Sequence, residues 1–152
     1  MLKTNKIWLY TMILSIIGAI DALYLSLVKL THTEVYCGGS SVCETVNSSS
    51  YSMVMGIPIA FLGFGAYLFL IVILFLEKRK VISLENFVYL NFGVCLVGLL
   101  FSIYLTYIEL FVLHAICPYC FASAVIMLLL FTLSVVRIYS IFTEEESKVT
   151  GG

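Results

Sequence analysis

Four long apolar runs, separated by shorter polar segments, dominate the pattern of hydrophobic and polar positions along the chain. They cover residues 7–30, 53–76, 87–113 and 121–142. Each is long enough for an α-helix to cross the hydrocarbon core of a bilayer, which takes about 20 residues. An open chain can satisfy its backbone N–H and C=O groups in lipid only by forming helices. The pattern therefore predicts an all-α integral membrane protein, built as a bundle of four transmembrane helices.

The polar segments divide the chain into one domain and a tail. We interpret residues 1–143 as a single transmembrane domain and residues 144–152 as a polar C-terminal tail that frays. The first apolar run is too long for a removable signal peptide and lacks a small-residue cleavage site, so we expect a retained signal anchor. Between the first two runs, residues 44–55 could form a short helix in the membrane interface. Pro58 fits the first turn of the second helix.

The distribution of positive charge predicts the orientation of the bundle. Seven of the eight basic residues fall on one side of the predicted membrane: Lys3, Lys6, Lys78, Arg79, Lys80, Arg137 and Lys148. Only Lys29 falls on the other side. Cytoplasmic loops are enriched in lysine and arginine. Both termini are therefore predicted to be cytoplasmic, and the first loop and the turn near His114 are predicted to face outward.

Composition supports the membrane class and leaves the cysteines as the unusual chemistry. The 152 residues are 62% hydrophobic and 11% charged, with a mean hydropathy of +1.11, whereas a soluble domain carries about 25% charged residues. The net charge of -1 and the lack of a basic patch argue against nucleic acid as a partner. No GxGxxG, P-loop or HExxH motif occurs. Four of the five cysteines fall on the predicted outer side, where disulfides form and persist: Cys37, Cys43, Cys117 and Cys120.

The segment C-P-Y-C lies where the fourth helix is predicted to begin. Cys117 would be the N-cap and Pro118 the first helical residue, a position where proline's missing N–H costs nothing. Unpaired backbone N–H groups and the helix dipole favour a negative charge there, so we expect a lowered pKa for Cys117. Cys120 follows one turn later and should point inward where the bilayer begins. Such a dithiol can meet a lipid-dissolved oxidant on one side and an aqueous thiol on the other.

Other interpretations of the cysteines stay open on the residues alone. Cys117 and Cys120 could form a structural disulfide or half of a metal site, and all four outer cysteines could form a closed tetrahedral zinc site. Cys37 and Cys43 could staple the loop, or could pass electrons to Cys117 by thiol–disulfide exchange. The alternatives to a redox enzyme are thus a non-catalytic four-helix membrane protein with structural disulfides, and a cysteine-based metal-binding membrane protein. Two pairs on one face favour the relay.

Two stretches of the chain resemble the vitamin K epoxide reductase family in its bacterial branch. The first is CGGSSVCETVNSSSYSMVMGIP, which contains C-x5-C, then Val46, Ser49, Tyr51 and Gly56-Ile57-Pro58. The second is SIYLTYIELFVLHAICPYC, which leads into the last helix. The resemblance covers nearly the whole chain, and the order of the two cysteine pairs is that of this family.

The resemblance implies a function and a site. The fold would be a four-helix bundle that holds a quinone near its outer mouth, beneath a short capping half-helix from the first loop. Cys120 would contact the quinone (a menaquinone, ubiquinone or vitamin K type), and Cys117 would form a mixed disulfide with Cys43. Ser49 and Tyr51 could donate hydrogen bonds to a quinone carbonyl.

The family also implies a partner and a compartment. Cys37 would exchange with a thioredoxin-like or DsbA-like oxidoreductase, which makes disulfide bonds in secreted proteins. Many bacterial relatives carry a thioredoxin-like domain after the last helix; here the chain ends first, so we expect a separate partner chain. The vertebrate enzymes carry a tyrosine where Ala124 stands, so we expect simple quinone reduction. The protein would lie in the bacterial inner (cell) membrane, with its cysteine sites facing the periplasm or the outside.

Four further residues raise separate expectations. Asp21 lies in the middle of the first run, and we expect an interhelical hydrogen bond to a tyrosine such as Tyr24 or Tyr104, with proton handling as the alternative. Glu109 is expected to reach the interface. His114 is expected to be a solvated loop histidine, although it could also support the Cys117 thiolate. Cys95, in the middle of the third run, is expected to be a small buried apolar residue.

Overall fold

The computed structural model describes residues 2–31, 36, 45–46, 48–81 and 83–150. Four long helices account for most of them: α1 (Leu2–Thr31), α3 (Ile59–Lys78), α4 (Leu84–Phe111) and α5 (Pro118–Thr150). Each contains a segment long and apolar enough to cross a membrane. The predicted all-α bundle of four transmembrane helices is confirmed.

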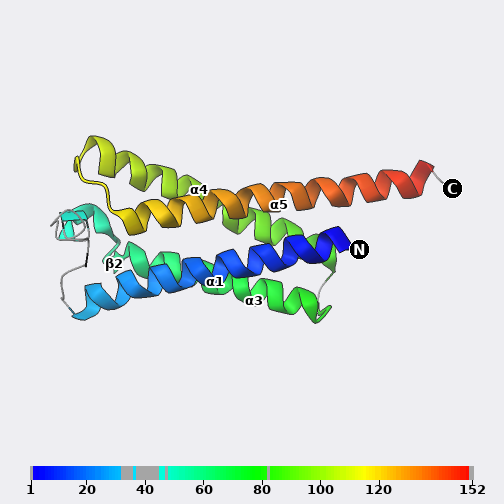
Figure 1. Ribbon diagram of the computed structural model, residues 1–152, viewed down its shortest axis with the longest axis horizontal. Helices are drawn as coiled ribbons and strands as arrows, with labels where there is room; N and C mark the ends of the chain where they lie inside the picture. Colours follow the sequence, from blue (N-terminus) through cyan, green and yellow to red (C-terminus); the bar gives the residue numbers. More distant parts are fainter. Residues whose placement is uncertain (1, 32–35, 37–44, 47, 82, 151–152) are drawn as a thin grey trace.

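The helices run antiparallel to their neighbours in the chain, so the connections gather at two ends (Figure 1). We call the end that holds residues 45–58 and 112–117 the cysteine end. The opposite end holds both chain termini and the α3–α4 connection, and we call it the termini end. Helix α1 packs against α3 and α5, and α4 packs mainly against α5, whereas α3 and α4 contact each other less.

A short hairpin directly precedes α3, in the residues with which the second apolar run begins. After one 3₁₀ turn, η1 (Ser50–Ser52), strand β1 (Met53–Val54) pairs antiparallel with β2 (Ile57–Pro58). Met55 and Gly56 both have positive φ, at 53° and 84°, which is the geometry of a two-residue type I′ hairpin turn. The apolar run begins at residue 53, but α3 begins at Ile59 with Pro58 as its N-cap, one residue later than the predicted first turn at Pro58.

Of the interfacial helix expected at residues 44–55, only the first part is helical in the structure. Thr45, Val46 and Ser48 are helical, and η1 then continues the segment toward the hairpin. At the other extreme of the chain, α5 continues to Thr150, so the expected fraying of the polar tail is wrong for residues 144–150. Three consecutive glutamates in this tail are good helix formers and extend the helix already started by the fourth span.

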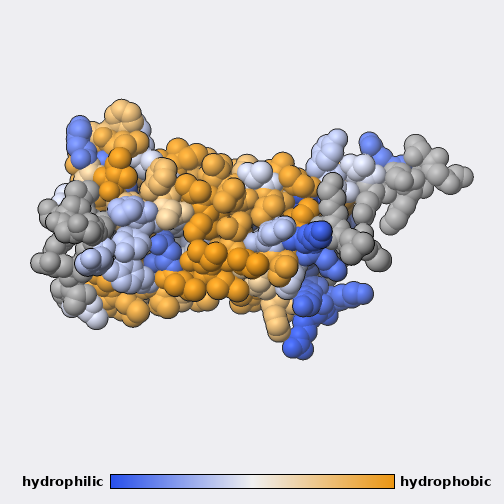
Figure 2. All heavy atoms as spheres, viewed as in Figure 1, coloured by the Kyte–Doolittle hydropathy of each residue, from blue (hydrophilic) through white to orange (hydrophobic). Residues whose placement is uncertain are grey.

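The surface of the bundle suits a lipid environment. Figure 2 shows an apolar band over the middle of the visible face, with hydrophilic residues gathered at both ends. Large apolar side chains are more than half exposed on all four helices, among them Ile20, Val72, Val97, Leu100, Ile103 and Leu128. Small polar side chains lie inside instead: Thr11, Ser15, Ser26 and Ser134 are almost completely buried. The protein is an integral membrane protein whose apolar side chains face the lipid.

Close helix packing in the middle of the bundle depends on two glycines. A methyl group added at Gly18 of α1 would overlap the ring of Tyr67 on α3, and one added at Gly98 of α4 would lie 2.7 Å from the Met127 side chain on α5. Small residues allow helices in lipid to approach each other in this way. Cys95 is fully buried in the same core, which confirms its expected structural role.

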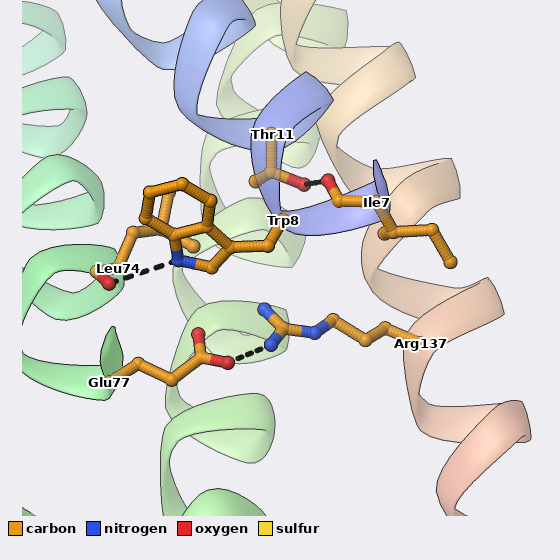
Figure 3. Close-up of polar contacts among 6 residues, drawn as sticks. All are labelled: Ile7, Trp8, Thr11, Leu74, Glu77 and Arg137. Atoms are coloured by element: carbon orange, nitrogen blue, oxygen red, sulfur yellow. Dashed lines mark hydrogen bonds and ion pairs between the residues drawn. The ribbon is translucent and has the colours of Figure 1, made fainter. Parts of the chain in front are cut away.

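At the termini end, an ion pair and a hydrogen bond join the helices to each other (Figure 3). The Arg137 guanidinium of α5 pairs with the Glu77 carboxylate of α3, and both side chains are at least 90% buried. The Trp8 indole of α1 donates a hydrogen bond of 3.1 Å to the Leu74 carbonyl of α3. The sequence treated Arg137 as a basic residue at the membrane surface, but the structure buries it inside the bundle.

Candidate functional site

The C-P-Y-C segment begins helix α5 at the cysteine end. Pro118 is the first helical residue and Cys117 precedes it directly, as the sequence predicted. The Cys117 carbonyl accepts the Phe121 N–H at 3.0 Å, which closes the first helical turn. Cys117 is 2% exposed and Cys120 is partly buried. No disulfide joins them.

The surroundings of Cys117 favour its thiolate. The hydrogen bond from the Cys120 thiol is the main cause, and backbone N–H groups of Cys120 and Tyr119 add to it. Burial and the nearby Glu109 carboxyl act in the opposite direction. The balance lowers the pKa of Cys117 from 9.0 to about 7. This is the direction expected for a cysteine at a helix N-terminus.

Glu109 of α4 lies directly against both thiols. Its carboxylate accepts the Cys117 backbone N–H at 3.2 Å and lies close enough to the Cys120 thiol to interact with it electrostatically. Its side chain is 5% exposed, so the expectation that Glu109 reaches the interface is wrong. The backbone carbonyl of Glu109 accepts the Ala115 N–H at 3.0 Å. The end of α4 thus holds the turn that leads into the dithiol.

A large apolar cavity opens from the dithiol into the gap between α3 and α4. Its volume is about 820 Å³, within the range of about 300–1,000 Å³ typical of small-molecule sites. Cys117, Cys120 and Glu109 line it at the cysteine end. Deeper lining comes from every helix of the bundle and includes Ala22, Gly63, Ala66, Gly93, Val97 and Met127. The gap exists because α3 and α4 pack against α1 and α5 more than against each other.

The segment before the hairpin covers the mouth of this cavity. Val46, Ser49, Tyr51 and Ser52 all line it. The Ser49 hydroxyl donates a 2.8 Å hydrogen bond to the Val46 carbonyl, which closes its own turn. Tyr51 is 47% exposed, and among the described residues its hydroxyl makes no hydrogen bond. The structure therefore places both predicted quinone donors at the cavity, with the Tyr51 hydroxyl the more available of the two.

Two tyrosines attach the first loop to the C-P-Y-C turn. The Tyr119 hydroxyl donates to the Tyr36 carbonyl at 3.0 Å, and the Tyr36 N–H donates to the Tyr24 hydroxyl at 3.4 Å. The rings of Tyr24 and Tyr119 pack with centroids 5.1 Å apart. On the far side of the loop, Val46 is buried in one apolar cluster with Cys117. Both flanks of the loop are thus held beside the dithiol.

The two loop cysteines predicted as catalytic, Cys37 and Cys43, lie outside the described residues. The zinc alternative depends on the same two cysteines. Among the residues that the structure describes, no three histidine, cysteine, aspartate or glutamate side chains gather closely enough to hold a metal ion.

Asp21 and His114 differ in how they relate to the site. Asp21 lines the cavity, and its buried Oδ2 has no hydrogen-bond partner within the described part of the chain, so the expected bond to Tyr24 or Tyr104 is wrong. His114 is exposed, with a φ of 50°, in the turn before Cys117. It is a solvated loop residue.

Sequence reasoning missed Glu109 and Tyr119 as parts of the site. An acidic residue inside a predicted membrane span is a functional signal in its own right. Glu109 carried that signal, and lies eight residues before Cys117. Tyr119 stands between the two cysteines, but nothing in the sequence indicated that Tyr24 and Tyr36 would meet it. The hydrogen bond between Tyr119 and Tyr36 joins residues that are 83 positions apart in the sequence.

A thiol pair that is buried at the edge of a membrane bundle and opens into an apolar cavity defines a membrane thiol oxidoreductase with a lipophilic substrate. Comparison with known families agrees: the model of the vitamin K epoxide reductase family matches residues 9–135. The chain belongs to this family, and it is a membrane-bound, quinone-linked thiol oxidoreductase. A search among curated proteins found no match.

Proposed function

We propose that the protein takes electrons from a thioredoxin-like or DsbA-like partner and passes them through Cys37 and Cys43 to Cys117 and Cys120, and then to a quinone. This activity would support disulfide bond formation outside the cytoplasm. One observation carries the proposal: the Cys117–Cys120 pair lies between a turn that holds both flanks of the polar loop and a cavity suited to a lipophilic ring.

The anchored flanks of the loop support the first half of the relay. Cys37 directly follows Tyr36, and Cys43 precedes Val46 by three residues. An extended chain spans about 3.3–3.6 Å per residue, so three residues reach roughly 10 Å at most. Tyr36 binds Tyr119 and Val46 packs with Cys117, so the described residues on both flanks of the loop cysteines lie at the C-P-Y-C turn, which supports the proposed exchange.

The proposed chemistry is two successive thiol–disulfide exchanges followed by quinone reduction. The Cys43 thiolate attacks Cys117 in the oxidised pair, the Cys117–Cys120 bond breaks, and Cys120 leaves with the electron pair. Cys37 then attacks Cys43, closes the loop disulfide and releases Cys117. Cys120 delivers an electron pair to the quinone ring as the Cys117–Cys120 bond forms again. Two thiols lose two electrons and two protons, and the quinone gains both.

The cavity suits a quinone that carries an apolar tail. The ring would lie beside Cys120, with a carbonyl near the mouth where Tyr51 can donate a hydrogen bond. Ser49 could do so after releasing the Val46 carbonyl. The deeper gap between α3 and α4 would hold the tail. Exposed apolar side chains such as Leu62 and Val97 line that gap, which is consistent with access from the lipid.

We propose the orientation that the basic residues predict, in a bacterial cell membrane with the cysteine end outside. Lys78, Arg79 and Lys80 are all exposed at the termini end. With Arg137 buried against Glu77, it no longer counts as a surface charge. The remaining basic residues still lie overwhelmingly on the termini side, so the predicted orientation does not depend on it.

The experiment that tests this function measures quinone reduction by the purified chain in lipid nanodiscs, with decylubiquinone as acceptor and reduced thioredoxin as donor. Cys120→Ala should lower the rate by on the order of 10³-fold or more, because it removes the atom that delivers the electrons. Cys95→Ala is the matched control: it also removes one thiol, but in the core, and should retain the wild-type rate. Full activity in Cys120→Ala would refute the proposed function.

A further inference from the structure

Glu109 of α4 lies beside the C-P-Y-C dithiol at the start of α5. Its carboxylate accepts the Cys117 N–H at 3.2 Å, and the electrostatic influence of Glu109 on Cys120 places the carboxyl close to that thiol. Glu109 is buried and lines the same cavity as both thiols. From this geometry we propose that Glu109 is the acid–base partner of Cys120 in quinone reduction, a role that rests on the proposed function.

During thiol–disulfide exchange, Glu109 becomes the main acceptor for the proton of Cys120. When Cys117 forms a mixed disulfide, its sulfur is covalently engaged and no longer carries a negative charge to attract the Cys120 proton. Among the described residues, the Glu109 carboxyl is then the remaining acceptor in contact with the Cys120 thiol. A carboxylate accepts a proton and a carboxylic acid donates one, so this group can act in both halves of the cycle.

The proton moves in a closed cycle. When Cys43 attacks Cys117 and the Cys117–Cys120 bond breaks, protonated Glu109 donates its proton to the departing Cys120 sulfur. When Cys120 delivers its electron pair to the quinone, the Glu109 carboxylate takes the proton back. The two protons of the quinol come from water at the mouth, and the Cys37 and Cys43 thiols release two protons there on forming their disulfide. The dithiol of the thioredoxin-like partner then reduces that disulfide to two thiols and is itself oxidised. Charge and protons therefore balance over one turnover.

Nothing else in the described part of the site can replace Glu109 in this role. No lysine, arginine or histidine among the described residues forms a hydrogen bond or ion pair with its carboxyl. Among the described residues, the other titratable side chains that line the cavity are Asp21 of α1, Tyr51 of the segment before the hairpin, Tyr67 of α3 and Tyr89 of α4. Lys29 donates to the Ser52 hydroxyl at 2.9 Å and His114 is exposed. Among the described residues, none of these groups hydrogen-bonds to the Cys120 thiol.

Glu109 also has a structural contact that the test must separate from proton transfer. Its carboxylate accepts the Cys117 N–H and so helps to hold the turn. Glu109→Gln keeps the size and an acceptor oxygen for that N–H but cannot exchange a proton at neutral pH. Glu109→Ala removes both functions and leaves space beside Cys120 that a small carboxylic acid can fill.

The decisive measurement is the decylubiquinone reduction rate of these variants in nanodiscs with reduced thioredoxin. We expect Glu109→Gln to lower kcat roughly 100-fold, the usual size of a general acid–base contribution, with the KM for quinone within about twofold. Glu85→Gln, an exposed glutamate at the other end of α4, should retain the wild-type kcat. Added formate should raise the rate of Glu109→Ala in proportion to its concentration, and chloride at equal ionic strength should not.

The outcomes separate this inference from the proposed function. If Glu109→Gln retains the wild-type kcat while Cys120→Ala is inactive, the proposed function stands and the role of Glu109 is refuted. If both variants retain the wild-type rate, it is the proposed function that fails. A loss of activity in both Glu109 variants without rescue by formate would assign Glu109 to structure alone and overturn the proposal.

Discussion

The cysteine end and the termini end of the bundle are stabilised by different interactions. At the termini end, Arg137 and Glu77 form a buried ion pair between α5 and α3, and Trp8 bonds α1 to α3. At the cysteine end, hydrogen bonds tie turns to helix ends, and a cavity of about 820 Å³ separates α3 from α4. The helices are held together directly where no chemistry is expected, and they leave room where a substrate must bind and sulfur atoms must exchange partners.

The largest expected effect is a loss of stability on breaking the ion pair at the termini end. Arg137→Met should lower the free energy of unfolding by about 3–5 kcal/mol, because it leaves the Glu77 carboxylate buried without its partner. Lys80→Met, at the same end but exposed, is the control and should change stability by less than about 0.5 kcal/mol. Reversible unfolding in mixed micelles measures both. If the two variants are equally stable, the ion pair does not hold this end together.

The next effect concerns the thiolate at the cysteine end. With a pKa of about 7, Cys117 should be half ionised at pH 7, about 50-fold more than at its ordinary pKa of 9.0. The thiolate fraction rises as pH increases through 7 and is lost below it. Thiolate absorbance against pH measures this in a variant that retains only Cys117 and Cys120.

The cause of this shift can be separated by mutation. Replacing Cys120 by alanine in the same background removes the main hydrogen bond to Cys117, so the midpoint should move upward. The backbone N–H groups of the helix N-terminus remain, but burial and the Glu109 carboxyl oppose them, so the midpoint should lie well above 7. A midpoint that does not respond to Cys120 would show that the helix N-terminus alone stabilises the thiolate.

A smaller effect tests whether the cavity is the quinone site. Gly93 lines the cavity and has no atom within 4 Å of an added Cβ, so Gly93→Phe should fill part of the cavity without a backbone clash. We expect the KM for decylubiquinone to rise roughly tenfold, in line with the loss of an apolar contact surface. Gly65→Phe makes the same change at an exposed position on α3, also free of neighbours. Equal KM values in the two variants would place the quinone elsewhere.

The smallest expected effect concerns the attachment of the loop. Tyr119→Phe removes one hydrogen bond, to the Tyr36 carbonyl, and keeps the ring contact with Tyr24. A hydrogen bond of this kind contributes about 1 kcal/mol, so oxidation of reduced thioredoxin should slow about fivefold. Dithiothreitol, a small reductant that can reach Cys117 and Cys120 without the loop, should give a nearly unchanged rate. An equal decrease with both reductants would argue against a role in the relay.

The sequence predicted the helices well and their ends less well. Apolar run length indicated four spans, because a membrane helix needs about 20 apolar residues. Run length did not show that residues 53–58 lie outside the helix, where Met55 and Gly56 turn the chain into a hairpin before α3 begins. Hydrophobicity indicates which residues can enter lipid but not whether the backbone there is helical. The positive φ angles of Met55 and Gly56 reverse the chain in a turn instead of continuing a helix.

The candidate site divides in the same way. The C-P-Y-C spacing, the helix start at Pro118 and the lowered pKa of Cys117 are local properties, since they depend on one helical turn and its N–H groups. By itself the sequence determined four membrane helices and a reactive dithiol at the start of the last one. Only the tertiary structure decided that Glu109 of α4 meets Cys120, that Tyr119 binds Tyr36, and that α3 and α4 leave a cavity between them. Those features depend on how helices distant in the sequence rotate and pack against each other, which the periodicity of a single helix does not specify.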